Sequence, residues 1–248
     1  MRAVVTGASS GIGQELARVL HRNGYELTLV ARSADALDRL AAEFGGATVV
    51  AVDLADPESI GTVVSSTPEA DVLVNCAGFG EFGAFADTDP ARLDSMVALN
   101  VRALTDLTRA YLPGMLERKR GRVLNVASTA SFQPGPLMAT YYATKAYVLS
   151  LSEALHEETR GTGVSVTALC PGPTASGFQS AANLAGSTLF AGRKVPTSHS
   201  VAKFGYRAMC KGRAVAVPGV RNKLMAGSIR IIPRPIVRRI VKRAQEIT

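Results

Sequence analysis

Short apolar runs of four to six residues alternate along the chain with longer segments in which apolar residues recur every three or four positions. The short runs predict β-strands, and the longer segments predict amphipathic α-helices. Strands and helices that alternate in this rhythm form βαβ units, in which the strands lie parallel in one sheet with helices on both faces. The pattern therefore predicts a doubly wound α/β fold in three layers. The predicted strands are 2–6, 26–31, 47–52, 71–75, 122–127, 164–169 and 214–217, and the predicted helices are 12–22, 34–44, 57–66, 90–118 and 142–160.

The domain organisation follows from the absence of any divider. The sequence has no internal repeat, low-complexity stretch or linker, so residues 1–248 are predicted to form a single Rossmann-like domain. Gly- and Pro-rich loops at 77–90 and 133–136, and the segment 171–196, follow the C-terminal ends of predicted strands. Ligands bind at those ends in open α/β sheets, so these loops are the expected ligand contacts.

The composition fits a compact protein of a reducing compartment. Hydrophobic residues make up 47% of the chain and charged residues 19%, which favours a folded core over disorder. The three cysteines and three histidines are scattered, so neither a disulfide framework nor a metal site is expected. The N-terminal MRAVVTGAS begins directly on a strand pattern, and no run of 18 apolar residues occurs. We therefore expect a cytoplasmic protein without a signal peptide or a transmembrane helix.

The net charge of +8 belongs to the C-terminal part of the chain. Residues 1–192 hold 14 basic and 19 acidic side chains, whereas residues 193–248 hold 14 basic side chains and one acidic one. Within 219–248, eight arginines and lysines alternate with Ile and Val, and Pro233 and Pro235 split the segment. Two short, basic, amphipathic helices are predicted there. They can pack on protein, or lie peripherally on an anionic membrane; nucleic acid is not expected, because no aromatic platform accompanies the charge.

The first predicted strand and helix are joined by TGASSGIG at 6–13. Its glycines allow a tight turn and a close approach of the backbone to a pyrophosphate, for which the helix N-terminus offers N–H groups and a positive dipole end. The GxxxGxG spacing, with no GK[ST] after it, excludes a P-loop. A plain tight turn is the alternative to a dinucleotide site. The cofactor-binding residues predicted here are Gly7, Ser9, Ser10, Gly11, Ile12 and Gly13.

The second predicted strand ends in Val30-Ala31-Arg32-Ser33. Dinucleotide sites that bind NAD place an acidic residue about 20 residues past the glycines, and none stands here. An arginine can instead pair with a 2′-phosphate through its planar guanidinium. The sequence predicts NADP in preference to NAD, with Arg32 and Ser33 at the cofactor. A solvated arginine at a strand end is the alternative.

Seven motifs in register over roughly residues 1–175 resemble the short-chain dehydrogenase/reductase family. They are TGASSGIG at 6–13, Asp53, NCAG at 75–78, Asn100, Ser128, Tyr141-x-x-x-Lys145 and Pro171-Gly172. The resemblance implies that Asp53, with Leu54 beside it, holds the adenine end of the cofactor. It also implies that Asn75, Ala77 and Gly78 line the floor near the adenosine ribose, and that Pro171, Gly172 and Thr174 seat the carboxamide. The family commonly has a second Asn where Cys76 stands, a departure that we take as structural.

The resemblance further implies hydride transfer between nicotinamide and a carbonyl or alcohol carbon. A substrate lid is implied over 175–200, and a homodimer or homotetramer is implied through the helices predicted at 90–118 and 142–160. Apolar residues near the site favour a small, apolar substrate, although core packing explains them equally well. These residues are Phe79, Phe82, Phe85, Pro134, Pro136, Leu137, Met138, Phe178, Leu184, Leu189 and Phe190.

Reduction of a carbonyl leaves an alkoxide that needs a proton donor within hydrogen-bond distance. Lys145 lies one helical turn after Tyr141 on the same face, and its ammonium is expected to lower the tyrosine pKa. Tyr142 points about 100° away on the helix and is not predicted to react. Ser128 is expected to orient the substrate oxygen. By resemblance, Tyr141 and Lys145 also contact the nicotinamide ribose, and Asn100 holds a water that connects Lys145 to solvent.

These observations predict an NADP(H)-dependent oxidoreductase, a dehydrogenase or reductase acting on CH–OH groups. Its catalytic residues are Asn100, Ser128, Tyr141 and Lys145. The alternative is an NADP-binding sensor, or a membrane-surface module, that retains the fold without turnover.

Overall fold

The centre of the molecule is a seven-stranded sheet in the order β3-β2-β1-β4-β5-β6-β7, in which all pairings are parallel. The structure is a computed structural model that describes residues 1–175, 195–229 and 231–245. After β3 the chain crosses back to lay β4 beside β1, which makes β1/β4 the point where the strand order reverses. The strands are β1 (Arg2–Thr6), β2 (Glu26–Ala31), β3 (Thr48–Ala51), β4 (Val72–Asn75), β5 (Gly121–Val126), β6 (Val164–Leu169) and β7 (Val215–Ala216).

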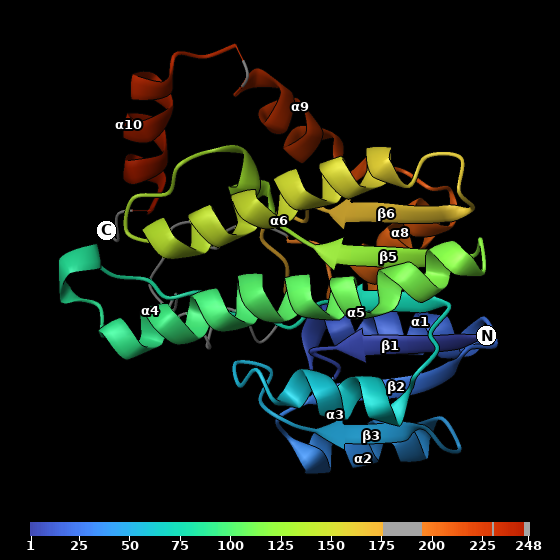
Figure 1. The fold of residues 1–248 in the computed structure, drawn as a ribbon. Helices are drawn as coiled ribbons and strands as arrows, with labels where there is room; N and C mark the ends of the chain where they lie inside the picture. The colour runs from blue at the N-terminus through green and yellow to red at the C-terminus, as the bar shows by residue number, and fades with distance from the viewer. Residues whose placement is uncertain (176–194, 230, 246–248) are drawn as a thin grey trace.

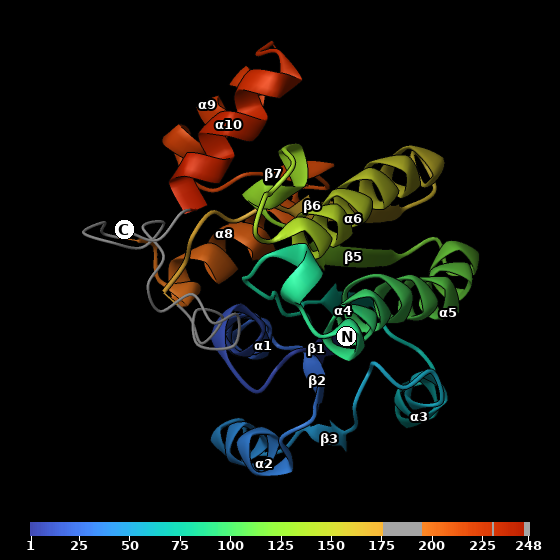
Figure 2. The same ribbon diagram turned by 90° about the vertical axis from the view of Figure 1, so that its left-hand side faces the viewer.

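Helices cover both faces of the sheet, so the predicted three-layer fold is confirmed (Figures 1 and 2). One face carries α1 (Gly11–Arg22), α2 (Ala34–Glu43) and α8 (Ser198–Cys210). The other carries α3 (Ser59–Ser66), α5 (Leu104–Glu117) and α6 (Ala139–Glu158). Successive strand residues feed opposite cores, as the two-residue period of a strand requires: Val5 packs with α1, whereas Val4 packs with α3 and α5. Burial on both faces explains why these strands are continuously apolar.

The segment 90–118, predicted as one helix, is helical from Pro90 to Glu117 but changes its geometry along the way. The first part is α4 (Pro90–Val97), where the Asp89 side chain accepts from the Ala91 N–H and Pro90 occupies the first turn. A π-helical segment, Ala98–Ala103, follows and leads into α5. π-Helical turns insert one extra residue and concentrate at functional sites. The predicted helix is therefore confirmed over Pro90–Glu117, and the π-helical turn at Asn100, a predicted site residue, is the feature that periodicity did not predict.

The basic extension folds as two helices, α9 (Val220–Ser228) and α10 (Arg234–Gln245), which lie beyond the β6–β7 end of the sheet (Figures 1 and 2). Pro233 precedes α10, and Pro235 lies in its first turn, where a missing N–H costs nothing. Val237 and Val241 of α10 are buried among Met96, Met138, Tyr141 and Tyr142. The inner face of the extension thus packs on the chain's own core. None of the helices that the structure describes is both long and apolar enough to span a bilayer.

Candidate active site

The glycine turn at the carboxyl end of β1 brings α1 into direct contact with the strand end. Gly7 and Gly11 have φ values of +67° and +58°, which favour glycine. A Cβ on Gly13 would stand 2.2 Å from the Gly7 carbonyl oxygen, so helix and turn touch backbone to backbone. Ser10 is the N-cap of α1, and its side chain makes no capping hydrogen bond. The helix N-terminus therefore keeps donors for an anion, and the turn fits a dinucleotide pyrophosphate.

Thr6, which the motif contains but the prediction of site residues omitted, ties this turn to the NCAG motif. Its hydroxyl accepts hydrogen bonds from the backbone N–H groups of Cys76 (3.0 Å) and Ala77 (3.1 Å) and donates to the Val74 carbonyl (3.3 Å). A Cβ on Gly7 would lie only 2.9 Å from the Ala77 nitrogen. The two motifs thus form one continuous backbone surface at the β1/β4 reversal, where ligands bind in this architecture.

The Asn75 side chain points away from that surface. It is buried, and its amide nitrogen donates to Asn125 Oδ1 (2.9 Å) and Thr108 Oγ1 (3.0 Å). Asn125 in turn donates to Ser152 Oγ (3.0 Å), which completes a polar chain from α5 through β4 and β5 to α6. Asn75 can therefore line a cofactor only through its main chain.

Arg32 and Asp53 lie together at the carboxyl ends of β2 and β3. Their side chains are 75% and 51% exposed, and Arg32 Nη1 is 4.0 Å from Asp53 Oδ2. Asp53 also accepts from the Ala55 N–H (3.0 Å), while Leu54 is buried beneath it. Ser33 stands at the N-cap of α2, without a side-chain cap. A weak, exposed ion pair leaves the Arg32 guanidinium able to turn toward a phosphate.

Asn100 sits in the π-helical segment and clamps the loop that follows NCAG. Its Oδ1 accepts from the Phe79 N–H (3.1 Å), and its Nδ2 donates to the Phe79 carbonyl (2.9 Å) and to Thr144 Oγ1 (3.1 Å). Thr144 belongs to α6, one residue before Lys145. Asn100 thus joins the NCAG loop to the helix that carries the predicted reactive pair. A Cβ on Gly78 would meet Asn100 Oδ1 at 2.8 Å, so this glycine permits the clamp.

Ser128, Tyr141 and Lys145 converge above the carboxyl end of β5. The Ser128 and Tyr141 side chains are hydrogen-bonded to each other. Ser128 also caps the short 3-10 helix Thr129–Phe132, since its Oγ accepts from the Ala130 N–H (3.1 Å). Lys145 Nζ donates to the Val126 carbonyl (2.9 Å) and lies 5.9 Å from the centre of the Tyr141 ring. The structure thus brings a hydroxyl pair and an amino group together.

Burial governs the protonation of this group. It raises the pKa of Tyr141 well above its ordinary value, and the hydrogen bond with Ser128 offsets only part of that rise. Burial also lowers the pKa of Lys145 to about 8. The lowered tyrosine pKa expected from Lys145 is therefore not found, because the ammonium donates to Val126 and desolvation dominates. At neutral pH Tyr141 holds its proton and can act as a donor.

Tyr142, the neighbour that was not predicted to react, is also buried. Its hydroxyl accepts from the Gln245 side chain of α10, and burial raises its pKa. The Gln245 carbonyl oxygen Oε1 is buried and has no partner among the residues that the structure describes. Gln245 was not predicted as a site residue, since only the fold brings it to Tyr142.

Pro171, Gly172 and Thr174 follow β6 beside the reactive group. The Pro171 carbonyl accepts from the Thr129 N–H (2.8 Å), and Thr174 Oγ1 donates to the Gly172 carbonyl (2.9 Å). Gly172 abuts Asn222 of α9, where a Cβ would lie 2.7 Å from the amide nitrogen. Asn222 was not predicted as a site residue, although the segment VPGVRN at 217–222 contains it. Most of the predicted lid 175–200, including Phe178, Leu184, Leu189 and Phe190, lies outside the described residues.

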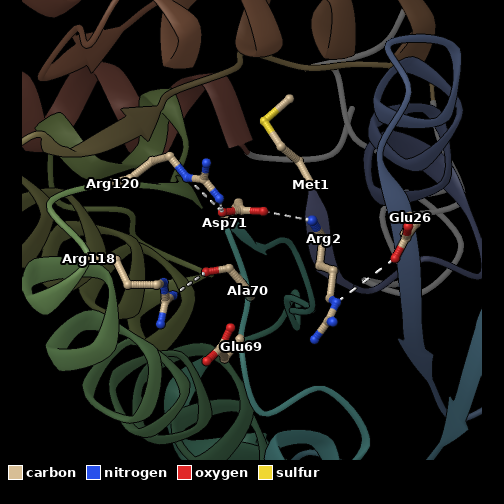
Figure 3. Close-up of a pocket in the computed structure, with 8 residues that line it drawn as sticks. All are labelled: Met1, Arg2, Glu26, Glu69, Ala70, Asp71, Arg118 and Arg120. Atoms are coloured by element: carbon tan, nitrogen blue, oxygen red, sulfur yellow. Dashed lines mark hydrogen bonds and ion pairs between the residues drawn. The ribbon is translucent and has the colours of Figure 1, made fainter.

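A polar pocket occupies the opposite edge of the sheet, at the amino ends of β1 and β4 (Figure 3). Asp71 accepts there from the Arg120 guanidinium (2.6 Å) and the Arg2 N–H (2.9 Å), and Arg118 donates to the Ala70 carbonyl (3.2 Å). Although burial acts to raise the pKa of Asp71, these bonds hold it below its ordinary value. Ligands bind at the other edge in such sheets, so we assign this pocket a structural role. Nowhere in the described ranges do three or more His, Cys, Asp or Glu gather to hold a metal ion.

A glycine turn at the strand reversal and a Ser–Tyr–Lys group beside it define a dinucleotide-binding oxidoreductase of the α/β class. The model of the short chain dehydrogenase family matches residues 1–185, and the chain belongs to this family.

Named relatives lie in the same family. The chain is 39% identical over 175 residues to the very-long-chain 3-oxoacyl-CoA reductase of Laccaria bicolor, covering 66% of this chain and 52% of that protein. It thus spans about half the length of that relative. It is 34% identical over 194 residues, 74% of each chain, to the uncharacterized oxidoreductase YvrD of Bacillus subtilis. Among solved structures, a short-chain dehydrogenase from Sphingobium yanoikuyae in complex with NADPH superposes with a TM-score of 0.83 at 29% identity, covering 92% of this chain and 93% of that one.

Proposed function

We propose that this protein transfers a hydride between NADP(H) and the carbonyl or alcohol carbon of a small, apolar substrate. The residues present fit the cofactor from end to end. The α1 N-terminus and the glycine turn would hold the pyrophosphate, Arg32 and Asp53 the adenosine end, and Pro171–Thr174 the nicotinamide end. When bound, the nicotinamide supplies or accepts the hydride.

The protein's own residues handle the proton. In reduction, the Tyr141 hydroxyl donates its proton to the substrate oxygen as the new alcohol forms, and in oxidation the same oxygen takes the proton back. The Ser128 hydroxyl orients the substrate oxygen through its hydrogen bond with Tyr141. Lys145 places a positive charge beside the tyrosine, which stabilises the anion left when the proton departs.

The observation that carries this proposal is the hydrogen-bonded Ser128–Tyr141 pair beside a buried Lys145. Replacement Tyr141→Phe removes only the reacting hydroxyl, so turnover in an NADPH-consumption screen of ketones, aldehydes and 3-oxoacyl compounds should fall at least about 100-fold, the loss typical of a missing acid/base group. NADPH binding, followed by fluorescence, should persist. Tyr142→Phe is the matched control and should keep most of the turnover.

Equal turnover in wild type and Tyr141→Phe would refute the acid/base role. A wild-type protein that binds NADPH but consumes none with any compound would favour the sensor alternative.

A preference for NADP over NAD rests on Arg32, with support from the NADPH complex of the Sphingobium relative. Replacement Arg32→Ala should weaken NADPH binding about tenfold or more and leave NADH binding nearly unchanged, because only NADPH carries the 2′-phosphate. Arg39→Ala, an exposed arginine on α2, is the control. Equal losses for both cofactors would overturn the assignment.

The apolar side chains around Tyr141 support an apolar substrate: Met96, Ala130, Met138, Phe79 and Phe82 pack in one cluster with it. The Laccaria relative is named for an acyl substrate, which is consistent with this proposal. We place the protein in the cytoplasm, as a homodimer or homotetramer assembled through α5 and α6. The exposed Tyr147 of α6, hydrogen-bonded to Thr105 of α5 (3.0 Å), marks the surface available for that assembly.

A further inference from the structure

The C-terminal extension, within residues 219–248, carries exposed arginines that form no ion pair among the residues that the structure describes. The sequence has no Asp or Glu between Glu158 and Glu246. On α10, the exposed Arg239 and Arg243 form no ion pair with any residue that the structure describes. Arg234 and Arg238 are likewise exposed, without an ion pair to a described residue. A surface of this kind attracts an anionic partner.

The same region exposes large aliphatic side chains. Ile231, in the connection between α9 and α10, is 85% exposed, and Ile236 and Ile240 of α10 are 48% and 55% exposed. The helices α9 and α10 lie past the β6–β7 end of the sheet (Figures 1 and 2). Neighbouring exposed aliphatics at such a place mark an interaction surface more than isolated ones do.

Helical geometry places two isoleucines and two arginines of α10 on one side of this helix. Successive residues are about 100° apart, so Ile236 and Ile240 fall beside Arg239 and Arg243, away from the buried Val237–Val241 stripe. We call Ile236, Arg239, Ile240 and Arg243 of α10, together with the exposed Ile231 that precedes this helix, the outer face. It combines aliphatic and guanidinium groups, whereas the inner face is packed on the protein. A basic helix with this composition lies in the plane of a lipid headgroup layer.

We propose that the outer face docks the protein on the surface of an anionic phospholipid bilayer. Arg239 and Arg243 meet lipid phosphates, and Ile231, Ile236 and Ile240 enter the boundary between headgroups and acyl chains. A second copy of this chain is disfavoured as the occupant, because a two-fold interface would set the same arginines against one another. A membrane matches both the charge and the aliphatic groups.

Flotation with vesicles tests the charge component, using phosphatidylcholine with phosphatidylserine and phosphatidylcholine alone. The full-length protein should bind the first and not the second, and added salt should weaken the binding. The double variant Arg239→Glu/Arg243→Glu should bind about tenfold or more weakly, since each basic group near an anionic surface contributes to the affinity. Lys203→Glu/Arg207→Glu, an exposed pair one turn apart on α8, changes the charge equally and should bind like wild type. If both double variants lose vesicle binding equally, the binding depends on net charge and not on the outer face, and the proposal is overturned.

The aliphatic component is tested with Ile231→Ser/Ile240→Ser, which should weaken vesicle binding severalfold while leaving the thermal midpoint unchanged, because both side chains are largely exposed. Val97→Ser, at a 44% exposed aliphatic outside the extension, is the control and should bind like wild type. Sedimentation of the same variants tests whether a second copy of the chain, and not a membrane, binds the outer face. If the isoleucine variant changes its oligomeric state but not its vesicle binding, the outer face belongs to a second copy of the chain and the proposal is overturned. The proposal is also overturned if the wild-type protein fails to float with the anionic vesicles.

Discussion

Lys145 is a cation in a place from which water is excluded. Its ammonium donates a hydrogen bond to the Val126 carbonyl, and the ionisable groups that act on it are two thiols, Cys76 and Cys170. Burial raises the pKa of both thiols to about 12, so at neutral pH they are uncharged and cannot balance the ammonium. A buried, unneutralised lysine is costly for stability, and such sites are kept where chemistry needs them.

Replacement Lys145→Met should therefore stabilise the fold while abolishing turnover. Burial lowers the Lys145 pKa from 10.5 to about 8. Below pH 8 Lys145 is protonated in both the folded and the unfolded chain, so the folded state bears the full cost of burying the ammonium. The gain in stability from the methionine is therefore largest below pH 8. As pH rises from 8 to 10.5 the wild type recovers stability, since only its folded state has lost the proton. Methionine forfeits the bond to Val126, so we expect the net rise in thermal midpoint at pH 7 to be about 2–5 °C.

Thermal unfolding of both proteins across this pH range is the measurement, with Lys203→Met on α8 as the control for a solvated lysine. A lower midpoint for Lys145→Met at pH 7, or a difference that grows between pH 8 and 10.5, would mean that the ammonium stabilises the native state.

At the scale of elements, periodicity predicted the seven strands and the helices α1, α2, α3 and α6 to within a few residues, because burial on both faces leaves continuous apolar runs in the strands and regular spacing in the helices. It missed α8 (Ser198–Cys210). It could not predict the π-helical turn within 90–118. One inserted residue barely changes an apolar pattern, and the contact that Asn100 makes from this turn is with Phe79, outside that segment.

The features of the site likewise fall into those that the sequence could predict and those that it could not. The glycine turn, Ser128, Tyr141 and Lys145 were predictable, since each belongs to a motif of fixed spacing and the structure brings them to one edge of the sheet. The direction of the Asn75 side chain was not, because it depends on Thr108 and Asn125 in other elements. Contacts between distant segments, such as Gln245 with Tyr142, leave no local signal at all.

In the whole molecule, α10 joins two environments. Its inner face, Val237 and Val241, packs in the cluster that contains Tyr141, while its outer face carries the exposed isoleucines and arginines. No residue of α9 or α10 belongs to the two main cores that hold the helices on the sheet. The extension therefore packs on a domain that its two main cores stabilise. A change in the inner face of α10 should affect the substrate side of the site without unfolding the sheet.

Replacement Val241→Asp tests this division, because an unpaired carboxylate on the inner face costs more than the packing there can offset. We expect kcat/KM for an apolar ketone to fall about tenfold or more, a loss of at least about 1.4 kcal/mol of transition-state stabilisation. NADPH affinity should stay within about twofold, since the glycine turn and Arg32 lie away from α10. Hydrogen exchange should rise in α10 and at the start of α6 but not in β1 or β4.

Ile240→Asp, one residue earlier and on the outer face, adds the same charge and should leave kcat/KM in solution unchanged. If the two variants lose activity equally, the inner face of α10 has no particular part in the site. If only Val241→Asp loses activity, the inner face of α10 lines the substrate side of the site while its outer face remains free for the membrane.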